Sequence, residues 1–560
     1  MIIVSSKLYT LSGNSKNLNS KGVFMKRFTS FLLIILVLLS TIAVSCAPKA
    51  APITDQVKID TGLISGTTVG DIHVYKGIPF AAPPVGNLRW KPPQPVTPWQ
   101  GVKDCTKFGP APMGYYNAMF PAFSKPPSED CLYLNVWTPA KMTGDKLPVM
   151  VWIYGGYYRF GEGSEPLYDG EKLAQHGVLV VTFNYRLGPL GWLAHPLLSE
   201  EDPHNSSGNY GLLDQIEALQ WVQKNIAAFG GDPNKVTIFG ESAGGTSVIC
   251  HMVSPLSKGL FQRAIAESAY ESSAWSDLRE DKYGVAAREK VGEQLAKDLG
   301  CDTAPDPIAC MRAKSAQEVM DKGQPSASIT TPGYNYEPCV DGWVLPDIPL
   351  NLFQAGKQHN VPLLIGTNAD EWALFHLLYK PTMDSYTTFV NSTFGDKAQQ
   401  VMTMYPATND KEAAEADLKV LTIYTFTCPA KVYAGAMSQV NSKAYFYQFS
   451  RVPPGAKMLG AFHLLEINYV FGTFRPFASP LKADAYFNDS DRALSETIMS
   501  YWTTFAANGD PNKAGLTQWP VYDATSGQYM DFGDTVQVKS GLYNEACDFM
   551  MDAHKAKRSQ

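Results

Sequence analysis

The most constraining stretch of the sequence alternates helical and strand patterns and then turns sharply. Apolar residues recur at helical spacing over 212–226, and the Gly-Gly-Asp-Pro segment at 230–233 ends that pattern. The apolar run 236–239 predicts a strand, which breaks at Gly240 into another apolar helical stretch. Strands and helices alternating in this way predict an α/β fold.

Other continuous apolar runs predict that the sheet is large and covered on both faces. The runs at 149–153, 178–183, 361–365 and 444–449 each fit a strand buried on both sides, as in parallel sheets. Residues 62–85, rich in Gly, Pro and β-branched types, predict short antiparallel strands. We therefore predict a large, mostly parallel central sheet with helices on both faces and a small N-terminal antiparallel β region.

Composition and charge favour one large globular domain without a nucleic-acid partner. The 560 residues are 45% hydrophobic and 18% charged, which allows a sizeable core, and we assign 58–550 to a single catalytic domain. The net charge of −6 and the lack of a Lys/Arg block in the body of the chain argue against binding a phosphate backbone. The basic end is assigned to a flexible tail, 551–560. The oligomeric state does not follow from the sequence.

The N-terminal region predicts export. Residues 1–24 form a polar extension, so that translation could start at Met25 instead of Met1. Residues 25–45 combine basic residues, an apolar run shorter than a membrane span and a small-residue end, the pattern of a signal peptide. The residues before Cys46 resemble a bacterial lipoprotein cleavage box, which implies lipidation of Cys46, a linker at 46–57 and a place in the cell envelope. Ordinary cleavage and secretion is the alternative.

Nine cysteines in an exported chain favour disulfide bonds. The candidate pairs are Cys301 with Cys310, Cys105 with Cys131, and Cys428 with Cys547. Cys250 and Cys339 lie in apolar surroundings, which favours buried free thiols. The connectivity stays open at this point.

The pattern Gly240-x-Ser242-x-Gly244 is typical of a nucleophile elbow. A serine exposed on a tight turn from strand to helix leaves no room for side chains two residues to either side, so glycine is required there. The N–H of Ala243 then begins the helix and can face a substrate oxygen. Ser242 is the candidate nucleophile.

A serine hydroxyl needs a base to remove its proton, and in such folds the order along the chain is serine, acid, histidine. The histidines well beyond Ser242 are His359, His376, His463 and His554. His463 follows a flexible Gly-Ala-Phe segment after the 444–449 strand, which suits a base carried on a loop. We select His463.

The acid is expected beyond the carboxyl end of the 361–365 strand, where α/β sheets place their active groups. Glu371 is our choice and Asp370 the reserve. A tetrahedral intermediate also needs N–H donors for its oxyanion, and the glycine turn after the 149–153 strand supplies them. Gly156, Tyr157 and Ala243 are the candidate donors.

These motifs resemble the type-B carboxylesterase family, which includes the cholinesterases and bile-salt-activated lipases. The resemblance covers nearly everything after about residue 59 and lies in the segments 76–81, 128–135, 184–188, 208–215, 229–233 and 239–244. It implies an α/β-hydrolase fold, a serine ester hydrolase and no cofactor. It places Ser242, Glu371 and His463 on the family's triad and Gly156, Tyr157 and Ala243 on its oxyanion hole. Glu241 and Glu466 match acids that support the triad.

Three departures from the family pattern bear on specificity and on the disulfides. Tyr157 stands where the family usually has glycine or alanine, which narrows the alcohol side of the site. Trp372 replaces the glycine after the acid. Pro112 lies near the usual place of the family's first-loop cysteine, while Cys105 lies upstream of it.

Aromatic residues give two further indications about the substrate. Trp275 matches a position that walls the acyl pocket in cholinesterases, with ordinary aromatic core as the equal alternative. The segment between Cys105 and Cys131 lacks the tryptophan that stacks on a quaternary ammonium in cholinesterases. We therefore expect small-molecule esters with uncharged alkyl or aryl alcohols.

Two other functions compete with esterase chemistry. Some relatives keep the fold as adhesion proteins without the triad, but here all three triad positions are filled. Amidase activity would use the same groups. No metal site is predicted, because neither HExxH nor a Cys/His cluster with zinc spacing occurs. The natural ester and its chain length do not follow from the sequence.

Overall fold

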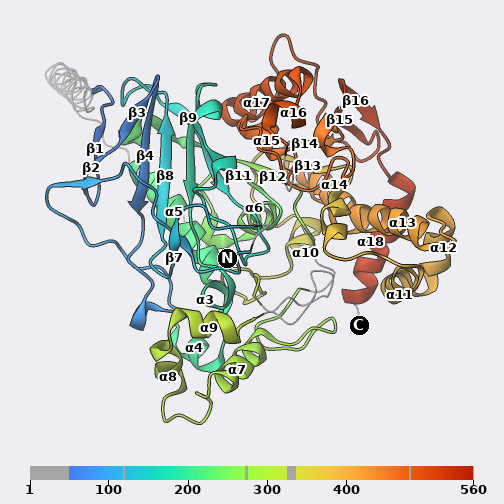
Figure 1. Cartoon of the computed structure of the whole chain (residues 1–560), viewed down its shortest axis with the longest axis horizontal. Helices are drawn as coiled ribbons and strands as arrows, with labels where there is room; N and C mark the ends of the chain where they lie inside the picture. Colours follow the sequence, from blue (N-terminus) through green and yellow to red (C-terminus); the bar gives the residue numbers. More distant parts are fainter. Residues whose placement is uncertain (1–49, 118–119, 272–274, 325–335, 478–480, 559–560) are drawn as a thin grey trace, which may run out of the picture. The chain divides into compact units, whose positions relative to one another are not determined.

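The computed structural model describes residues 50–117, 120–271, 275–324, 336–477 and 481–558 (Figure 1). The predicted extension, the signal peptide and Cys46 lie outside these ranges. Pro52–Gln560 form one compact unit. Within the described ranges, we find no helix that combines the length and the apolar character of a membrane span.

An eleven-stranded mixed sheet runs through this unit, in the order β16-β15-β14-β13-β12-β11-β9-β10-β8-β4-β3. Neighbours from β10 to β15 pair in parallel, and both ends of the sheet are antiparallel. Its strands are β3 (Thr67–Val69), β4 (Ile72–Pro79), β8 (Tyr133–Thr138), β9 (Leu147–Ile153), β10 (Leu179–Phe183), β11 (Gly231–Glu241), β12 (Arg263–Glu267), β13 (Leu363–Asn368), β14 (Ala444–Phe449), β15 (Gln528–Phe532) and β16 (Val536–Ser540). The predicted mostly parallel centre is confirmed.

Two small sheets lie beside the large one. They are built from β1 (Gln56–Ile59), β2 (Gly62–Ser65) and β5 (Val102–Asp104), and from β6 (Pro110–Pro112) and β7 (Lys125–Ser128). The first contains an antiparallel β1–β2 pair, as predicted for the N-terminal region, and also a parallel β2–β5 pair.

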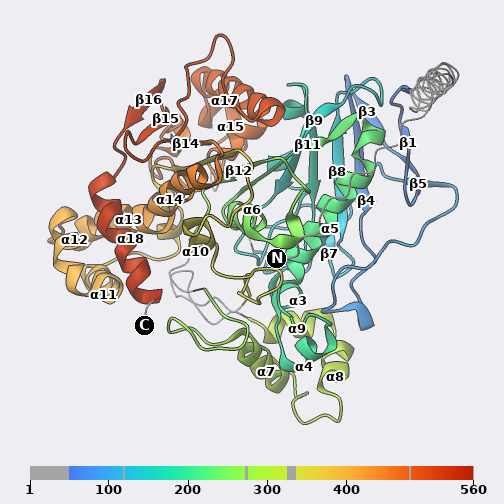
Figure 2. The same cartoon turned by 180° about the vertical axis from the view of Figure 1, so that it is seen from behind.

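Helices of the described residues pack on the central strands. Both α6 (Ala243–Val253) and α17 (Asp489–Asn508) contact β9 and β11, and α14 (Cys428–Ala436) contacts β13 and β14. Figure 2 shows α17 and α15 (Ile467–Phe471) beside β14 and β15, as does the opposite view. The remaining helices are α2 (Glu171–Ala174), α3 (Gly188–Trp192), α4 (Pro196–Glu201), α5 (Tyr210–Asn225), α7 (Arg288–Asp298), α8 (Pro307–Ala313), α9 (Ala316–Lys322), α10 (Pro349–Gln354), α11 (Met383–Phe394), α12 (Ala398–Met404), α13 (Asp410–Thr422), α16 (Ala483–Tyr486) and α18 (Asn544–Arg558).

The ends of the folded unit differ from the predicted ones. The assigned linker 46–57 already belongs to the fold at Ile53, whose buried side chain and N–H bond to Lys141 O (2.8 Å) fix it. The assigned tail 551–560 is helical up to Arg558, because α18 continues through it. His554 is buried there and stacks on Tyr424 with 4.2 Å between ring centroids. The prediction of a tail was wrong because it rested on the basic residues at the end of the chain. The helix also has an apolar face, and Met550, Met551 and Ala553 on it are buried.

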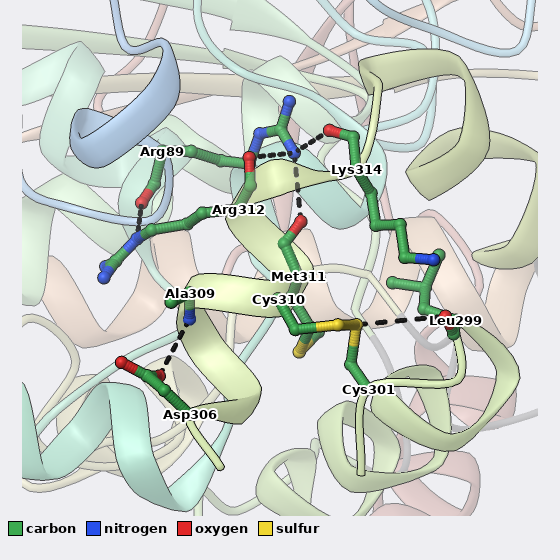
Figure 3. The surroundings of a disulfide bond; sticks show 9 residues. All are labelled: Arg89, Leu299, Cys301, Asp306, Ala309, Cys310, Met311, Arg312 and Lys314. Carbon is green, nitrogen blue, oxygen red and sulfur yellow. Dashed lines mark hydrogen bonds between the residues drawn. A yellow bond between two sulfur atoms is a disulfide. The ribbon is translucent and has the colours of Figure 1, made fainter. Parts of the chain in front are cut away.

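Two of the predicted disulfides form. Cys428 and Cys547 connect α14 to α18 across 119 residues. Cys301 and Cys310 close a nine-residue separation at α8, where the Arg89 guanidinium donates to the carbonyl oxygens of Met311 and Lys314 (Figure 3). A cross-link of this kind stabilises chiefly by restricting the unfolded chain, more so for the longer loop.

The predicted bond between Cys105 and Cys131 is wrong, because both are buried free thiols. Cys105 lies between two other chain segments, with Cys105 N bonded to Ser65 O at 2.8 Å. Pro112 pairs with Ser128 between β6 and β7 and lines a small cavity together with Cys131. Cys250 and Cys339 are free and buried, as predicted.

Candidate active site

Ser242 stands on a strained turn between β11 and α6. Its backbone has φ 59° and ψ −124°, a conformation that residues other than glycine rarely adopt. A Cβ on Gly240 would lie 2.5 Å from the Ile153 carbonyl oxygen, and one on Gly244 would overlap the same oxygen. Glycine is therefore required at both positions, and the chain makes the sharp turn from strand to helix that the sequence predicts at Ser242.

The glycine loop after β9 lies against this turn. The register that pairs Ile153 with Gly240 carries the loop to the elbow, and a Cβ on Gly155 would be 2.8 Å from the Ser242 Cβ. Gly156 and Tyr157 continue the loop with φ of 104° and 54°. Ala243 opens α6, where a backbone N–H has no acceptor within its own helix. The three predicted oxyanion donors are thus on segments that meet at Ser242.

His463 and Glu371 form a direct pair. His463 Nδ1 lies 2.6 Å from Glu371 Oε2, and Glu371 Oε1 accepts from Asn368 N at 2.7 Å. Both side chains are buried. The second ring nitrogen, His463 Nε2, has no hydrogen-bond partner within the described ranges and lies 3.1 Å from Glu241 Oε1. Glu371 therefore holds the imidazole through Nδ1, while Nε2 lies beside Glu241, and His463 and Ser242 line the same pocket.

Asp370, the reserve acid, holds the histidine loop instead of the imidazole. Asp370 N donates to Ala461 O at 3.1 Å, and Asp370 Oδ2 accepts from Ala461 N at 3.0 Å. Lys419 Nζ lies 3.2 Å from Asp370 Oδ1 at the partly exposed side. These bonds connect the turn that carries Glu371 to the loop that carries His463.

The other candidate histidines have separate partners. His359 Nε2 lies 2.9 Å from Ser254 O, His376 Nε2 lies 3.1 Å from Asp417 Oδ2, and His554 Nε2 lies 3.1 Å from Tyr424 O. None of them lines the pocket at Ser242 in the described part of the chain. The choice of His463 agrees with this geometry.

Four glutamates are buried in this region: Glu241 and Glu267 end β11 and β12, Glu371 follows β13, and Glu466 directly precedes α15. Burial, and then the charges of the neighbouring glutamates, raise the pKa of Glu241 and of Glu466 well above the ordinary value. Burial raises the pKa of Glu267 to about 8, although Trp502 Nε1 donates to it at 2.7 Å. The sequence predicts roles for Glu241 and Glu466 but none for Glu267. The sequence does show that Glu267 ends an apolar strand. This points to the site only when β12 is known to pair with β11, which carries Glu241.

A cavity of about 640 Å³ opens at Ser242 and His463. Its walls are mainly aromatic and aliphatic, and Phe120 stacks on Phe160 with 4.3 Å between ring centroids. Trp275 lies outside this lining, in a small neighbouring cavity with Thr246 and Tyr270, and its Nε1 donates to Glu271 Oε1 at 3.0 Å. A substrate contact for Trp275 stays a prediction.

A model of the carboxylesterase family matches residues 53–550 of this chain, a match that spans every site residue described above. The chain belongs to the carboxylesterase family. It is a serine ester hydrolase of the α/β-hydrolase fold, as the sequence predicted.

This chain is similar to several esterases over most of their length. The fumonisin B1 esterase of Sphingopyxis macrogoltabida is 37% identical over 505 residues, which cover 88% of this chain and 90% of that protein. The cholinesterase of Mus musculus is 35% identical over 570 residues, covering 93% and 90%. The para-nitrobenzyl esterase of Bacillus subtilis (strain 168) is 37% identical over 478 residues, covering 82% and 91%. A solved PNB esterase structure superposes with a TM-score of 0.75 at 34% identity, covering 89% of this chain and 99% of that one.

Tyr157 is expected to restrict this carboxylesterase to alcohols that are not tertiary. Its ring lines the pocket against Phe375, with 5.8 Å between ring centroids. We expect slow hydrolysis of a tert-butyl ester by the unmodified enzyme. Tyr157→Gly should raise kcat/KM on that ester by roughly 10–200-fold, the usual effect of relieving a clash of methyl size. The backbone at φ 54° accepts glycine without strain.

The matched n-butyl ester serves as the control in steady-state assays of both proteins. Its kcat/KM should change little, because a straight chain avoids the space that Tyr157 occupies. Fast hydrolysis of the tert-butyl ester by the unmodified enzyme would contradict this account of Tyr157.

Proposed function

We propose that the chain hydrolyses carboxylic esters of uncharged alkyl or aryl alcohols through an acyl-enzyme on Ser242. The observation that carries the proposal is the 2.6 Å bond between His463 and Glu371, together with the pocket that His463 and the Ser242 turn line in common. The proposed roles are nucleophile for Ser242, general base and acid for His463, and orienting carboxylate for Glu371.

In the first half-reaction, Ser242 Oγ attacks the ester carbonyl carbon and His463 Nε2 takes the hydroxyl proton. The tetrahedral oxyanion accepts hydrogen bonds from the N–H groups of Gly156, Tyr157 and Ala243. As the intermediate collapses, His463 returns the proton to the departing alcohol oxygen. In the second half-reaction, His463 Nε2 takes a proton from water, which attacks the acyl carbon. His463 then returns that proton to Ser242 Oγ, and the carboxylic acid is released.

The pocket supports an apolar substrate without a quaternary ammonium group. Its volume of about 640 Å³ lies in the range of small-molecule sites. The wall contains Phe120, Phe375 and Phe477, and the described part of the lining has no tryptophan on which a cation could stack. Apolar alkyl or aryl groups gain free energy on burial against such a wall.

Ester and amide substrates with the same two halves test the proposal. We expect the ester to be hydrolysed far faster than the amide, because protonation of the leaving amine by His463 is the harder step. A faster amide would favour the amidase function, and inactivity on both would favour a binding protein. Hydrolysis assays with neutral butyl and phenyl esters make the comparison.

We also propose that the protein is exported and anchored through a lipid on Cys46. The lipoprotein-like segment before Cys46 supports this, as do the Cys301–Cys310 and Cys428–Cys547 bonds, which are typical of oxidising compartments. Fatty-acid labelling that is lost in Cys46→Ala is the expected result. Equal labelling of both proteins would overturn the proposal.

A further inference from the structure

The pocket wall presents one arginine without an acidic partner. Apart from His463, the acidic and basic side chains of the described lining are Glu165 and Arg475. Arg475 is exposed and forms no ion pair with any carboxylate in the described ranges. A guanidinium carries its charge at all working pH values and offers several N–H donors in one plane, the geometry that suits a carboxylate.

The backbone under Arg475 is fixed. Arg475 N donates to Asn468 Oδ1 at 2.5 Å, and Thr473 Oγ1 donates to Leu167 O at 3.0 Å. Between them, the Phe474 ring packs edge-on against Phe487 with 5.2 Å between centroids. The side chain therefore starts from a defined point in the wall, although its head is accessible to solvent.

The alcohol half of the ester is expected along the wall that contains Arg475. Because His463 returns its proton to the departing alcohol oxygen, that half must extend past His463. The chain that follows His463 builds this wall, from Leu464 through Asn468 to Arg475.

Glu165, the acidic side chain of this wall, favours its protonated and therefore neutral form at pH 7. Burial and the charge of Glu162 raise the pKa of Glu165 to about 8. A protonated Glu165 can donate a hydrogen bond, and it does not cancel the positive charge of Arg475. The pocket consequently favours a negative group over a positive one.

We propose that Arg475 binds a carboxylate on the alcohol half of the substrate, remote from the ester oxygen, and thereby selects such esters over neutral ones. The inference rests on the proposed function and narrows its substrate class. Esters of uncharged alcohols remain substrates, and an apolar segment between the ester and the carboxylate would lie along the aromatic wall.

Acetyl esters of straight-chain ω-hydroxy acids, paired with those of the matching ω-hydroxy amides, test this inference. The two probes of a pair have the same length and shape, and they differ in that the carboxylate is charged and the amide is neutral and carries N–H donors. We expect the full-length enzyme to hydrolyse the acetyl ester that carries the carboxylate with about tenfold higher kcat/KM than the one that carries the amide, at the best chain length. High salt should weaken this preference. Arg475→Gln should abolish this preference and leave the amide probe within about twofold.

Arg492→Gln is the matched control. Arg492 lies over the Phe474 ring at 4.8 Å, is paired with Asp484 and does not line the pocket. It should keep the preference, whereas Arg475→Glu should reverse it. Equal rates on acid and amide, or an equal loss on both in Arg475→Gln, would overturn the inference while hydrolysis of the amide probe still supports the proposed function. If neither probe is hydrolysed, the proposed function fails.

Discussion

Ser242→Ala is expected to lower kcat on a short-chain nitrophenyl ester about 10⁶-fold, as removal of the nucleophile does in other serine triads. Ser242 is the one serine in the described lining of the pocket, which contains no cysteine, so the loss should be nearly complete. Release of nitrophenol under saturating substrate measures it. The residual rate should reflect polarisation by the backbone donors of the oxyanion hole.

The folded structure should survive this change. The Ser242 backbone N–H donates to Glu267 O at 3.0 Å, and alanine keeps that bond. Equal melting temperatures of both proteins are the control. A folded Ser242→Ala protein that retains more than about a hundredth of the activity would remove Ser242 from the mechanism.

Glu371→Gln should lower kcat about 10⁴-fold, the effect of the equivalent change in another serine triad. An amide at this position can still accept from Asn368 N, so the local structure is kept. It can no longer favour the imidazole tautomer that carries hydrogen on Nδ1, nor stabilise the imidazolium that forms. The rate on the same nitrophenyl ester measures the loss.

Asp370→Asn is the matched control for the choice between the two adjacent acids. Its carboxylate bonds to the loop at Ala461 and pairs with Lys419, so an amide should reduce stability and lower kcat by less than about tenfold. If Asp370→Asn caused the larger loss of kcat and Glu371→Gln the smaller one, Asp370 would be the acid of the triad.

That Ser242, His463 and Glu371 lie near one another could be predicted from the sequence, because Ser242 and Glu371 each leave a local mark. The elbow requires glycine on both sides of Ser242, and Glu371 follows the end of β13 directly. Strand β13 itself begins at Leu363 and not at 361, because Pro362 lacks the N–H that a strand uses.

Features that depend on pairing across the sheet could not be predicted in this way. Glu267 joins the buried acids only because β12 lies beside β11, a relation that no local pattern encodes. Cys105, which forms no bond to Cys131, is likewise held by backbone hydrogen bonds to Ser65 and Lys76, contacts between chain segments that no local pattern encodes. Local sequence patterns thus predict individual strands and helices, but they do not show which of these elements contact one another in the fold.

The buried glutamates around the triad imply that folding takes up protons. Glu267 keeps its proton to about pH 8, whereas the unfolded chain would lose it near pH 4.5. The stabilisation that this difference provides is complete below pH 4.5 and is lost as the pH rises through 8. Glu241 and Glu466 shift in the same direction. The free energy of unfolding should therefore fall as the pH rises from about 4.5 to about 8, and the buried carboxyl groups at the ends of β11 and β12 are the source of that fall.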